Sequence, residues 1–358
     1  MKYEYWFANI KGIGNKWKQV IRSQVASAEE LYYIEETALK RIVKNEESRH
    51  KILQSVKEWK LEEEYQKLIR KQVELVTIFN SHYPERLKKI SSPPYALYVK
   101  GELPVEDKLS AAIVGARKCS AYGEMMAKAF AEELARCDVQ IISGVARGID
   151  GIAQKAVLDA GGKTFGVLGC GVDICYPREH YHLYSEMQKN GGVISEQPLG
   201  MSPLAQFFPA RNRIISGLSD IILVIEAKEQ SGSLITADMA LEQGKDIYAL
   251  PGNVTSMLSK GCHNLIRQGA GILLSPQEFI EELGILQKGK GEKVIENKIS
   301  LESAENIVYS CLDFQPQNPS YIFEHTGMEI SKILDILVDL ELRGYIREVS
   351  KNNFVKVK

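Results

Sequence analysis

The chain has 358 residues, of which 44% are hydrophobic and 25% are charged, with 45 basic and 46 acidic side chains. At about 150 residues per domain, this length predicts two or three domains, and the composition is that of a soluble protein. The formal net charge of -1 excludes a uniformly basic surface, and no apolar run approaches the roughly 20 residues that span a bilayer. We therefore expect a cytoplasmic protein that makes no membrane contact.

The sequence indicates neither a metal site nor a catalytic residue. The six cysteines include no CxxC pair and no disulfide spacing, so we expect reduced thiols. Cys170, Cys175, His180 and His182 lie close together but match no zinc pattern, and small buried thiols are the simpler interpretation. Because no general acid and base pair is evident, we expect no cofactor and no enzymatic activity.

Residues 1–83 are predicted to form a helical domain that is SAM-like or helix-hairpin-helix-like. Apolar residues recur there at helical spacing, with lysine and glutamate between them. The segment Ile-Lys-Gly-Ile-Gly at residues 10–14 lies between two helical patterns, and its glycines would let backbone amides approach a phosphate. A plain tight turn is the alternative, which a single copy of the motif favours.

Residues 84–286 are predicted to form the central domain, which the chain enters through an extended connector with Pro84, Pro93 and Pro94. Short apolar runs then alternate with helical patterns. The runs cover residues 111–114, 139–142, 164–168, 192–195, 221–225, 246–250 and 272–274. Strands that are buried on both faces give continuous apolar runs, so we predict an α/β fold with an extended Rossmann-like, doubly wound parallel sheet.

Residues 287–299 are predicted to be a linker, and residues 300–358 a winged-helix domain, because three helical patterns precede two short strands. The third helical pattern, at residues 330–342, has a polar face that is mostly acidic. Such a face repels phosphate. We therefore expect a protein-contact or regulatory domain rather than one that contacts the bases of duplex DNA.

Glycine, serine and arginine gather in the loops that follow the predicted strands. In chain order they are Gly115, Arg117 and Ser120; Ser143, Gly144, Arg147 and Gly148; Gly169 and Gly171; Arg178; Arg211 and Arg213; and Ser231, Gly232 and Ser233. Ligands of open α/β sheets bind beyond the carboxyl ends of the strands, where backbone amides and arginine forks suit phosphate. One such loop is often only a turn, but the convergence of five loops predicts a phosphate- or nucleotide-binding edge.

The same loops carry six motifs in order between about residues 110 and 275. They are Gly-Ala-Arg at 115–117 with Tyr-Gly at 122–123, Ser-Gly-x-Ala-Arg-Gly-Ile-Asp at 143–150, Gly-Cys-Gly at 169–171, Phe-Pro-x-Arg-Asn-Arg at 208–213, Ser-Gly-Ser-Leu-Ile-Thr at 231–236 and Pro-Gly at 251–252. In their order and density these motifs resemble the DNA-processing protein A (DprA/Smf) family. The helical start and the winged-helix end also resemble the layout of that family but are less diagnostic.

The resemblance implies a sequence-independent single-stranded DNA-binding protein without catalytic turnover. Such a protein protects incoming strands and helps to load the recombinase RecA in natural transformation. The resemblance also implies a homodimer, whose self-association surface maps near Leu265, Ile266, Ile272 and Leu273. Ordinary core packing is an equal alternative at these four positions.

For single residues, the resemblance implies that Arg117 holds a backbone phosphate and that Arg178 takes the basic position after Tyr-Pro. Asp150 is expected to orient an arginine or to cap a helix rather than to touch DNA. The chain departs from the family at positions 116 and 119, which are Ala and Cys where small hydroxyl residues are common. Ser120 is the substitute that we expect.

Two other functions remain as alternatives. Glycine-rich loops on such a sheet also suit a nucleotide-binding sensor or an enzyme similar to nucleotide-monophosphate phosphoribohydrolases. A catalytic acid beside the phosphate loops would distinguish such an enzyme, and the sequence offers no clear candidate. A transcription regulator that acts through residues 300–358 is disfavoured by the acidic helix.

Overall fold

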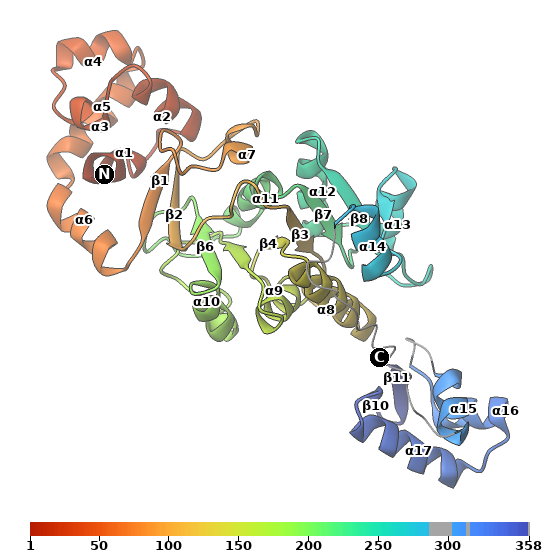
Figure 1. Cartoon of the computed structure of the whole chain (residues 1–358). Helices are drawn as coiled ribbons and strands as arrows, with labels where there is room; N and C mark the ends of the chain where they lie inside the picture. The colour runs from red at the N-terminus through yellow and green to blue at the C-terminus, as the bar shows by residue number, and fades with distance from the viewer. Residues whose placement is uncertain (286–302, 313–315, 357–358) are drawn as a thin grey trace. The chain divides into compact units, whose positions relative to one another are not determined.

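The computed structural model describes residues 1–285, 303–312 and 316–356 (Figure 1). The chain divides into two compact units, Met1–Cys119 with Ala127–Leu286, and Ser120–Met126 with Gln287–Lys358. The predicted linker at 287–299 lies outside the described residues, and the boundary at residue 83 stays a prediction. In the described part of the chain, no helix is long and apolar enough to cross a membrane.

The first unit begins with a helical region, as predicted. Its helices are α1 (Lys2–Ala8), α2 (Asn15–Arg22), α3 (Ala28–Tyr32), α4 (Glu36–Ile42), α5 (Glu46–Glu58) and α6 (Leu61–Arg70). Trp6 and Phe7 of α1 are fully buried and share a core with Tyr98 of the sheet. Between α1 and α2 the chain makes a tight turn, where Gly12 has a φ of +75° and its carbonyl accepts a hydrogen bond from Lys51 Nζ (3.3 Å). Phosphate binding at this turn stays a prediction.

The strands of the first unit form one nine-stranded sheet in the order β1-β2-β6-β5-β4-β3-β7-β8-β9. They are β1 (Glu74–Thr77), β2 (Ala96–Gly101), β3 (Ser110–Val114), β4 (Gln140–Ser143), β5 (Thr164–Val167), β6 (Gly191–Ser195), β7 (Ile221–Val224), β8 (Asp246–Ala249) and β9 (Gly271–Ile272). Strands β3 to β9 pair in parallel, whereas β2 pairs antiparallel with β1 and β6. The predicted apolar runs match the parallel strands, which confirms the α/β fold class.

Strand β2 corrects the prediction of an extended connector before residue 100. Its Leu97 and Val99 are buried, and it pairs with β6, with Tyr98 opposite Ser195. The prolines at positions 93 and 94 therefore mark only the entry into a strand. This antiparallel addition extends the sheet toward the N-terminal helices, whose core includes Tyr98.

Helices cover both faces of the sheet. They are α7 (Glu85–Lys88), α8 (Ala121–Arg136), α9 (Ile149–Asp159), the 3-10 helix η1 (Arg178–His180), α10 (Tyr181–Met187), α11 (Phe207–Leu218), α12 (Gly232–Glu242), α13 (Lys260–Arg267) and α14 (Pro276–Glu282). Figure 1 shows α9 and α10 on one side of the sheet and α11 and α12 on the other. Strand β3 lies between β4 and β7, where the order of the strands reverses, so a crevice is expected at the carboxyl end of β3.

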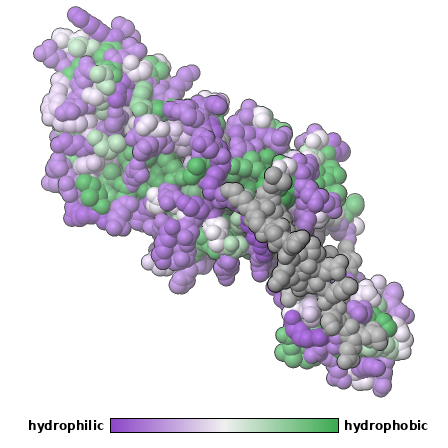
Figure 2. All heavy atoms as spheres, in the orientation of Figure 1, coloured by the Kyte–Doolittle hydropathy of each residue, from purple (hydrophilic) through white to green (hydrophobic). Residues whose placement is uncertain are grey.

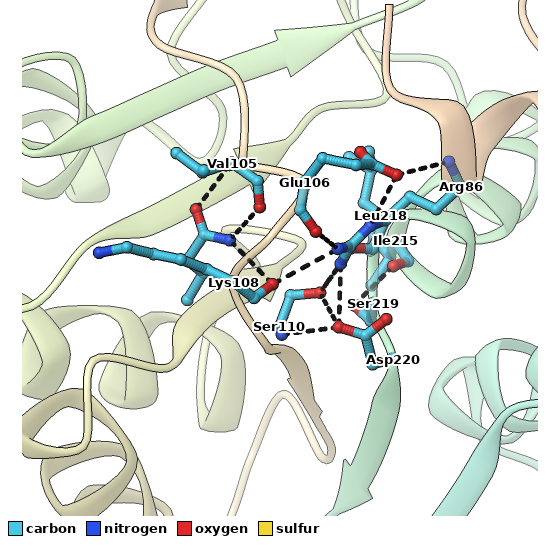
Figure 3. Close-up of polar contacts among 10 residues, drawn as sticks. Arg86, Val105, Glu106, Lys108, Ser110, Ile215, Leu218, Ser219 and Asp220 are labelled. Atoms are coloured by element: carbon cyan, nitrogen blue, oxygen red, sulfur yellow. Dashed lines mark hydrogen bonds and ion pairs between the residues drawn. The ribbon is translucent and has the colours of Figure 1, made fainter.

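The opposite end of the sheet is closed by a polar network around Arg86 (Figure 3). Its Nη1 donates to Asp220 Oδ2 (3.0 Å) and to the Leu218 carbonyl (3.2 Å), and also to the Ser110 hydroxyl. The Ser110 amide donates to the same Asp220 carboxylate (2.9 Å). Arg86 thus ties α7 to the amino ends of β3 and β7, and the carboxyl ends of these strands remain for a ligand.

The second unit contains a winged-helix domain, as predicted. Its elements are α15 (Ser303–Cys311), α16 (Pro319–Thr326), α17 (Ile330–Leu342), β10 (Ile346–Ser350) and β11 (Asn353–Lys356). The two strands pair antiparallel, with Glu348 opposite Phe354. Val308, Ile322 and Leu337 are fully buried and form its core with Phe354.

Candidate functional site

A pocket of about 600 Å³ opens at the carboxyl ends of β3, β4 and β7. Gly115 and Arg117 contribute to its wall from the loop after β3, and Asp150 from the start of α9. The first turns of α11 and α12 complete the wall. This is the crevice that a doubly wound sheet offers where its strand order reverses. The pocket gathers six of the predicted site residues, namely Gly115, Arg117, Arg211, Ser231, Gly232 and Ser233.

Asp150 holds the first two loops together. Its side chain is buried, and its carboxylate accepts a hydrogen bond from the Gly144 amide (3.1 Å), while the amides of Ala146 and Gly115 also stabilise its charge. Burial raises the pKa of Asp150, and the positive charge of Arg211 opposes that rise. Asp150 therefore shapes the pocket through backbone amides of both loops.

Arg211 lies at the floor of the pocket and is only 6% exposed. Its Nη1 donates to the carbonyls of Gly144 (2.6 Å) and Val167, and its Nε donates to Asn212 Oδ1 (3.0 Å). Among the described residues, Nη2 has no hydrogen-bond partner. Burial lowers the pKa of Arg211, and Asp150 counteracts this effect. Arg211 thus fixes the loops after β4 and β5, and only the Nη2 edge is available to an anion.

Arg117 is exposed at the rim of the pocket, next to an aromatic pair. Its guanidinium carbon lies 5.9 Å from the centre of the Phe208 ring, and the Phe208 and Tyr176 rings are 5.5 Å apart. All three side chains line the pocket. A cation beside aromatic faces suits a nucleotide, because the phosphate and the base each meet a matching group. Neither aromatic residue was among the site residues predicted from the sequence, although Phe208 begins the Phe-Pro-x-Arg-Asn-Arg motif.

The opposite wall is the N-terminal end of α12. Ser231 caps this helix, because its Oγ accepts a hydrogen bond from the Ser233 amide (3.4 Å) and lies 2.7 Å from the Ser233 hydroxyl. The side-chain Nδ2 of Asn212 donates to the Gly232 carbonyl (3.2 Å), and its Oδ1 accepts from Arg211, so Asn212 links this wall to Arg211. The free amides at the start of a helix favour an anion.

Several predicted residues of the second loop lie behind the pocket rather than in its wall. The Ser143 hydroxyl is fully buried and donates to the Ile113 carbonyl (2.6 Å), so it is engaged within the fold, and its role as a ligand group stays a prediction. Gly144 and Gly148 permit close approach: a Cβ on Gly144 would lie 2.1 Å from Arg211 Nη2, and Gly148 has a φ of +70°. These residues therefore shape the loop. Gly169 and Gly171 likewise pack closely, against Phe208 and against the Pro198 carbonyl.

The remaining predicted arginines lie outside the pocket wall. Arg213 donates through Nη1 and Nη2 to Glu196 (2.8 and 2.6 Å) and through Nε to the Ser92 carbonyl (2.9 Å), so it is engaged within the fold, and phosphate binding by Arg213 stays a prediction. Arg147 is exposed and forms an ion pair with Glu179. Arg178 is exposed at the start of η1. Ser120 immediately precedes α8, and its Oγ accepts a hydrogen bond from the Gly123 amide (3.1 Å).

The predicted self-association residues separate into core and surface. Leu265 and Leu273 are buried, at 5% and 1% exposure, and Ile266 is partly buried against the core. Ile272 is 46% exposed on β9, which is an edge strand of the sheet. Core packing therefore accounts for Leu265 and Leu273, and Ile272 is the exposed member of the set. Self-association at these residues stays a prediction.

Comparison with known proteins agrees with this architecture. The model of the family described as DNA recombination-mediator protein A matches residues 74–284, and that of the DprA winged helix domain matches residues 296–350. Protein Smf of Escherichia coli is 38% identical over 283 residues, which cover 77% of this chain and 75% of that protein. DNA processing protein DprA of Bacillus subtilis is 41% identical over 212 residues, which cover 59% of this chain and 71% of that protein.

Two solved structures are similar to the chain. DNA processing protein A of Streptococcus pneumoniae has a TM-score of 0.69 at 33% identity and covers 79% of this chain and 98% of its own. DNA processing protein A of Helicobacter pylori, solved for its single-stranded DNA binding mode, has a TM-score of 0.55 at 30% identity and covers 59% of this chain and 95% of its own. With the motifs and the fold, these matches show that the chain belongs to the DNA-processing protein A (DprA/Smf) family.

Proposed function

We propose that the chain is a sequence-independent single-stranded DNA-binding protein and that the strand is held in the pocket at the carboxyl ends of β3, β4 and β7. One observation carries this proposal: a single pocket joins an exposed arginine, an aromatic pair and the N-terminal end of helix α12. Phosphate contacts give affinity without sequence preference, and stacking accepts any base. Membership of the family and the DNA-binding relative from Helicobacter pylori support it.

Within the pocket, Arg117 and the amides of Ser231 and Gly232 are the groups that we assign to backbone phosphate. Phe208 and Tyr176 are assigned to an unstacked base, which a single strand supplies more readily than a duplex. Arg147 and Arg178 are exposed beyond the wall and would extend a basic track along the strand. Arg211, at the floor of the pocket, would contact a phosphate through its Nη2 edge.

The wider role is also part of the proposal. Protection of incoming strands, loading of RecA in natural transformation, a homodimer and a cytoplasmic location are supported by the family. For the homodimer, the exposed Ile272 on the edge strand β9 is the surface residue that we assign. Self-association at a strand edge would place the pockets of two chains on one assembly.

An enzyme that releases bases from nucleotides is the second candidate. Asp150 lines the pocket with a raised pKa, which is a feature of catalytic acids. However, its carboxylate is engaged by loop amides, so it is placed to organise the loops. Release of free base from nucleoside monophosphates on incubation with the full chain would favour this candidate.

A salt series on the full chain tests the DNA proposal. We expect an oligothymidine to bind more tightly than a duplex of the same length, with a linear fall of the logarithm of affinity against the logarithm of salt concentration. Equal affinity for the oligothymidine and the duplex, or an affinity that does not change with salt concentration, would contradict the proposed binding mode.

A further inference from the structure

Helix α17 of the winged-helix domain has apolar residues on two faces. Three of its residues are fully buried in the domain core: Ile333, Leu337 and Leu340. Four others are exposed and form what we call the outer stripe: Ile330 (44%), Leu334 (39%), Val338 (55%) and Leu342 (82%). Because they recur at every fourth position, they lie in one row along the helix. The space-filling view shows apolar atoms at the surface of this domain (Figure 2).

Four large aliphatic side chains in one exposed row differ from isolated surface apolar residues. Single exposed aliphatic residues are ordinary, whereas a contiguous row on a soluble protein marks an interaction surface. A helix with apolar residues on two faces is usually packed between two layers. Within the described part of the winged-helix domain, only the face with Leu337 is packed. The outer stripe therefore has the character of a docking surface.

The charges beside the outer stripe are mostly acidic. At about 100° per residue, Asp335 borders the row on one side and Glu341 on the other. The nearby Arg343 forms ion pairs with Glu305 (2.7 Å) and Asp339 (3.0 Å), so its charge is offset within the domain. These borders oppose contact with DNA. They also oppose pairing with the same helix of a second copy, which would place carboxylates against carboxylates.

We propose that the outer stripe of α17 binds an amphipathic helix of a partner protein whose apolar face is bordered by lysine or arginine. Apolar rows of residues four apart pack into the grooves of a facing helix, and basic borders would pair with Asp335 and Glu341. This site is independent of the proposed DNA pocket and uses none of its residues.

Two synthetic helical peptides test the proposal with the full chain. Both carry the same leucine face, one with lysine borders and the other with glutamate borders. In fluorescence anisotropy titrations we expect the lysine peptide to bind at least tenfold more tightly than the glutamate peptide, and more weakly as salt is raised. The double variant Leu334→Ser/Val338→Ser should lose at least tenfold in affinity for the lysine peptide, whereas Val254→Ser, at a position that is 80% exposed in the other unit, should not.

Both substituted side chains of the double variant are exposed, so its thermal unfolding should match that of the unchanged chain. Equal binding of the two peptides, no binding of either, or unchanged binding by the double variant would overturn the proposal. A change in sedimentation of the double variant would also overturn it, because a second copy would then cover the stripe. Single-stranded DNA affinity should stay unchanged, which separates this test from that of the DNA pocket.

Discussion

Arg147 and Glu179 form an ion pair that joins the loop after β4 to η1. Arg147 Nη2 donates to Glu179 Oε2 (2.8 Å), and Nε donates to the other carboxylate oxygen. Both side chains are more than half exposed, and the hydrogen bond from Arg147 lowers the pKa of Glu179. In the free protein, the Glu179 carboxylate thus pairs with the Arg147 guanidinium, which we assign to a DNA phosphate.

Glu179→Gln should therefore strengthen single-stranded DNA binding. The change removes a competitor for Arg147, and because exposed ion pairs are weak we expect a gain of about two- to fivefold. Affinity for an oligothymidine should also fall more steeply with salt. Glu186→Gln is the matched control, because it removes an exposed carboxylate of α10 that pairs with Lys189. An equal gain in the control would indicate a general charge effect instead.

Arg213→Ala should destabilise the protein without weakening DNA binding by its folded form. The side chains of Arg213 and Glu196 are 15% and 11% exposed, so the substitution leaves a carboxylate largely buried without its ion-pair partner. We expect the free energy of unfolding in urea to fall by about 2–3 kcal/mol. Arg136→Ala breaks more exposed pairs and should cost less than about 1 kcal/mol. A loss of DNA affinity in the folded Arg213→Ala variant would show that Arg213 contributes to DNA binding.

Gly144→Ala tests the packing of the pocket floor. The added Cβ would lie 2.1 Å from Nη2 of the buried Arg211, which must then give up hydrogen bonds to move. We expect a loss of about 2 kcal/mol in the free energy of unfolding. Gly232→Ala adds a methyl group with no atom within 4 Å and should leave stability unchanged. Equal stability of the two variants would show that Arg211 shifts freely.

Lys18 gives stability a pH dependence in the helical region. Burial lowers the pKa of Lys18 from its usual 10.5 to about 8. The unfolded chain therefore binds this proton more tightly, so the contribution of Lys18 to stability is lowest below pH 8 and rises toward pH 10.5. Relative to Lys18→Met, the unchanged chain should gain about 2 kcal/mol between pH 7 and pH 10 in urea unfolding. A difference that stays constant with pH would contradict the assigned burial of the charge.

The parallel sheet could be predicted from the sequence because its strands are buried on both faces. Segments such as Ile221–Val224 are therefore continuous apolar runs. Strand β2 (Ala96–Gly101) could not be distinguished from a connector, because one of its two partners, β6, begins at residue 191 and contacts so distant leave no local pattern.

The loops of the site could also be predicted, but the direction of each side chain could not. Arg117 and Arg213 both follow small or polar residues in motifs that were predicted to be loops. Arg117 lines the pocket, whereas Arg213 lies within α11 and pairs with Glu196. That difference depends on which acid the fold brings near. The contact between Gly144 and Arg211 likewise joins residues that are 67 positions apart.

The central claim is that the exposed Arg117 holds phosphate in the pocket. Its most direct test compares Arg117→Ala with Lys118→Ala in oligothymidine titrations over a salt series. Both positions are exposed and adjacent, but Arg117 lines the pocket and Lys118 does not. We predict that Arg117→Ala lowers affinity about tenfold and reduces the salt slope by about 0.7, while Lys118→Ala changes both far less. Equal losses in the two variants, or no loss in Arg117→Ala, would contradict the claim.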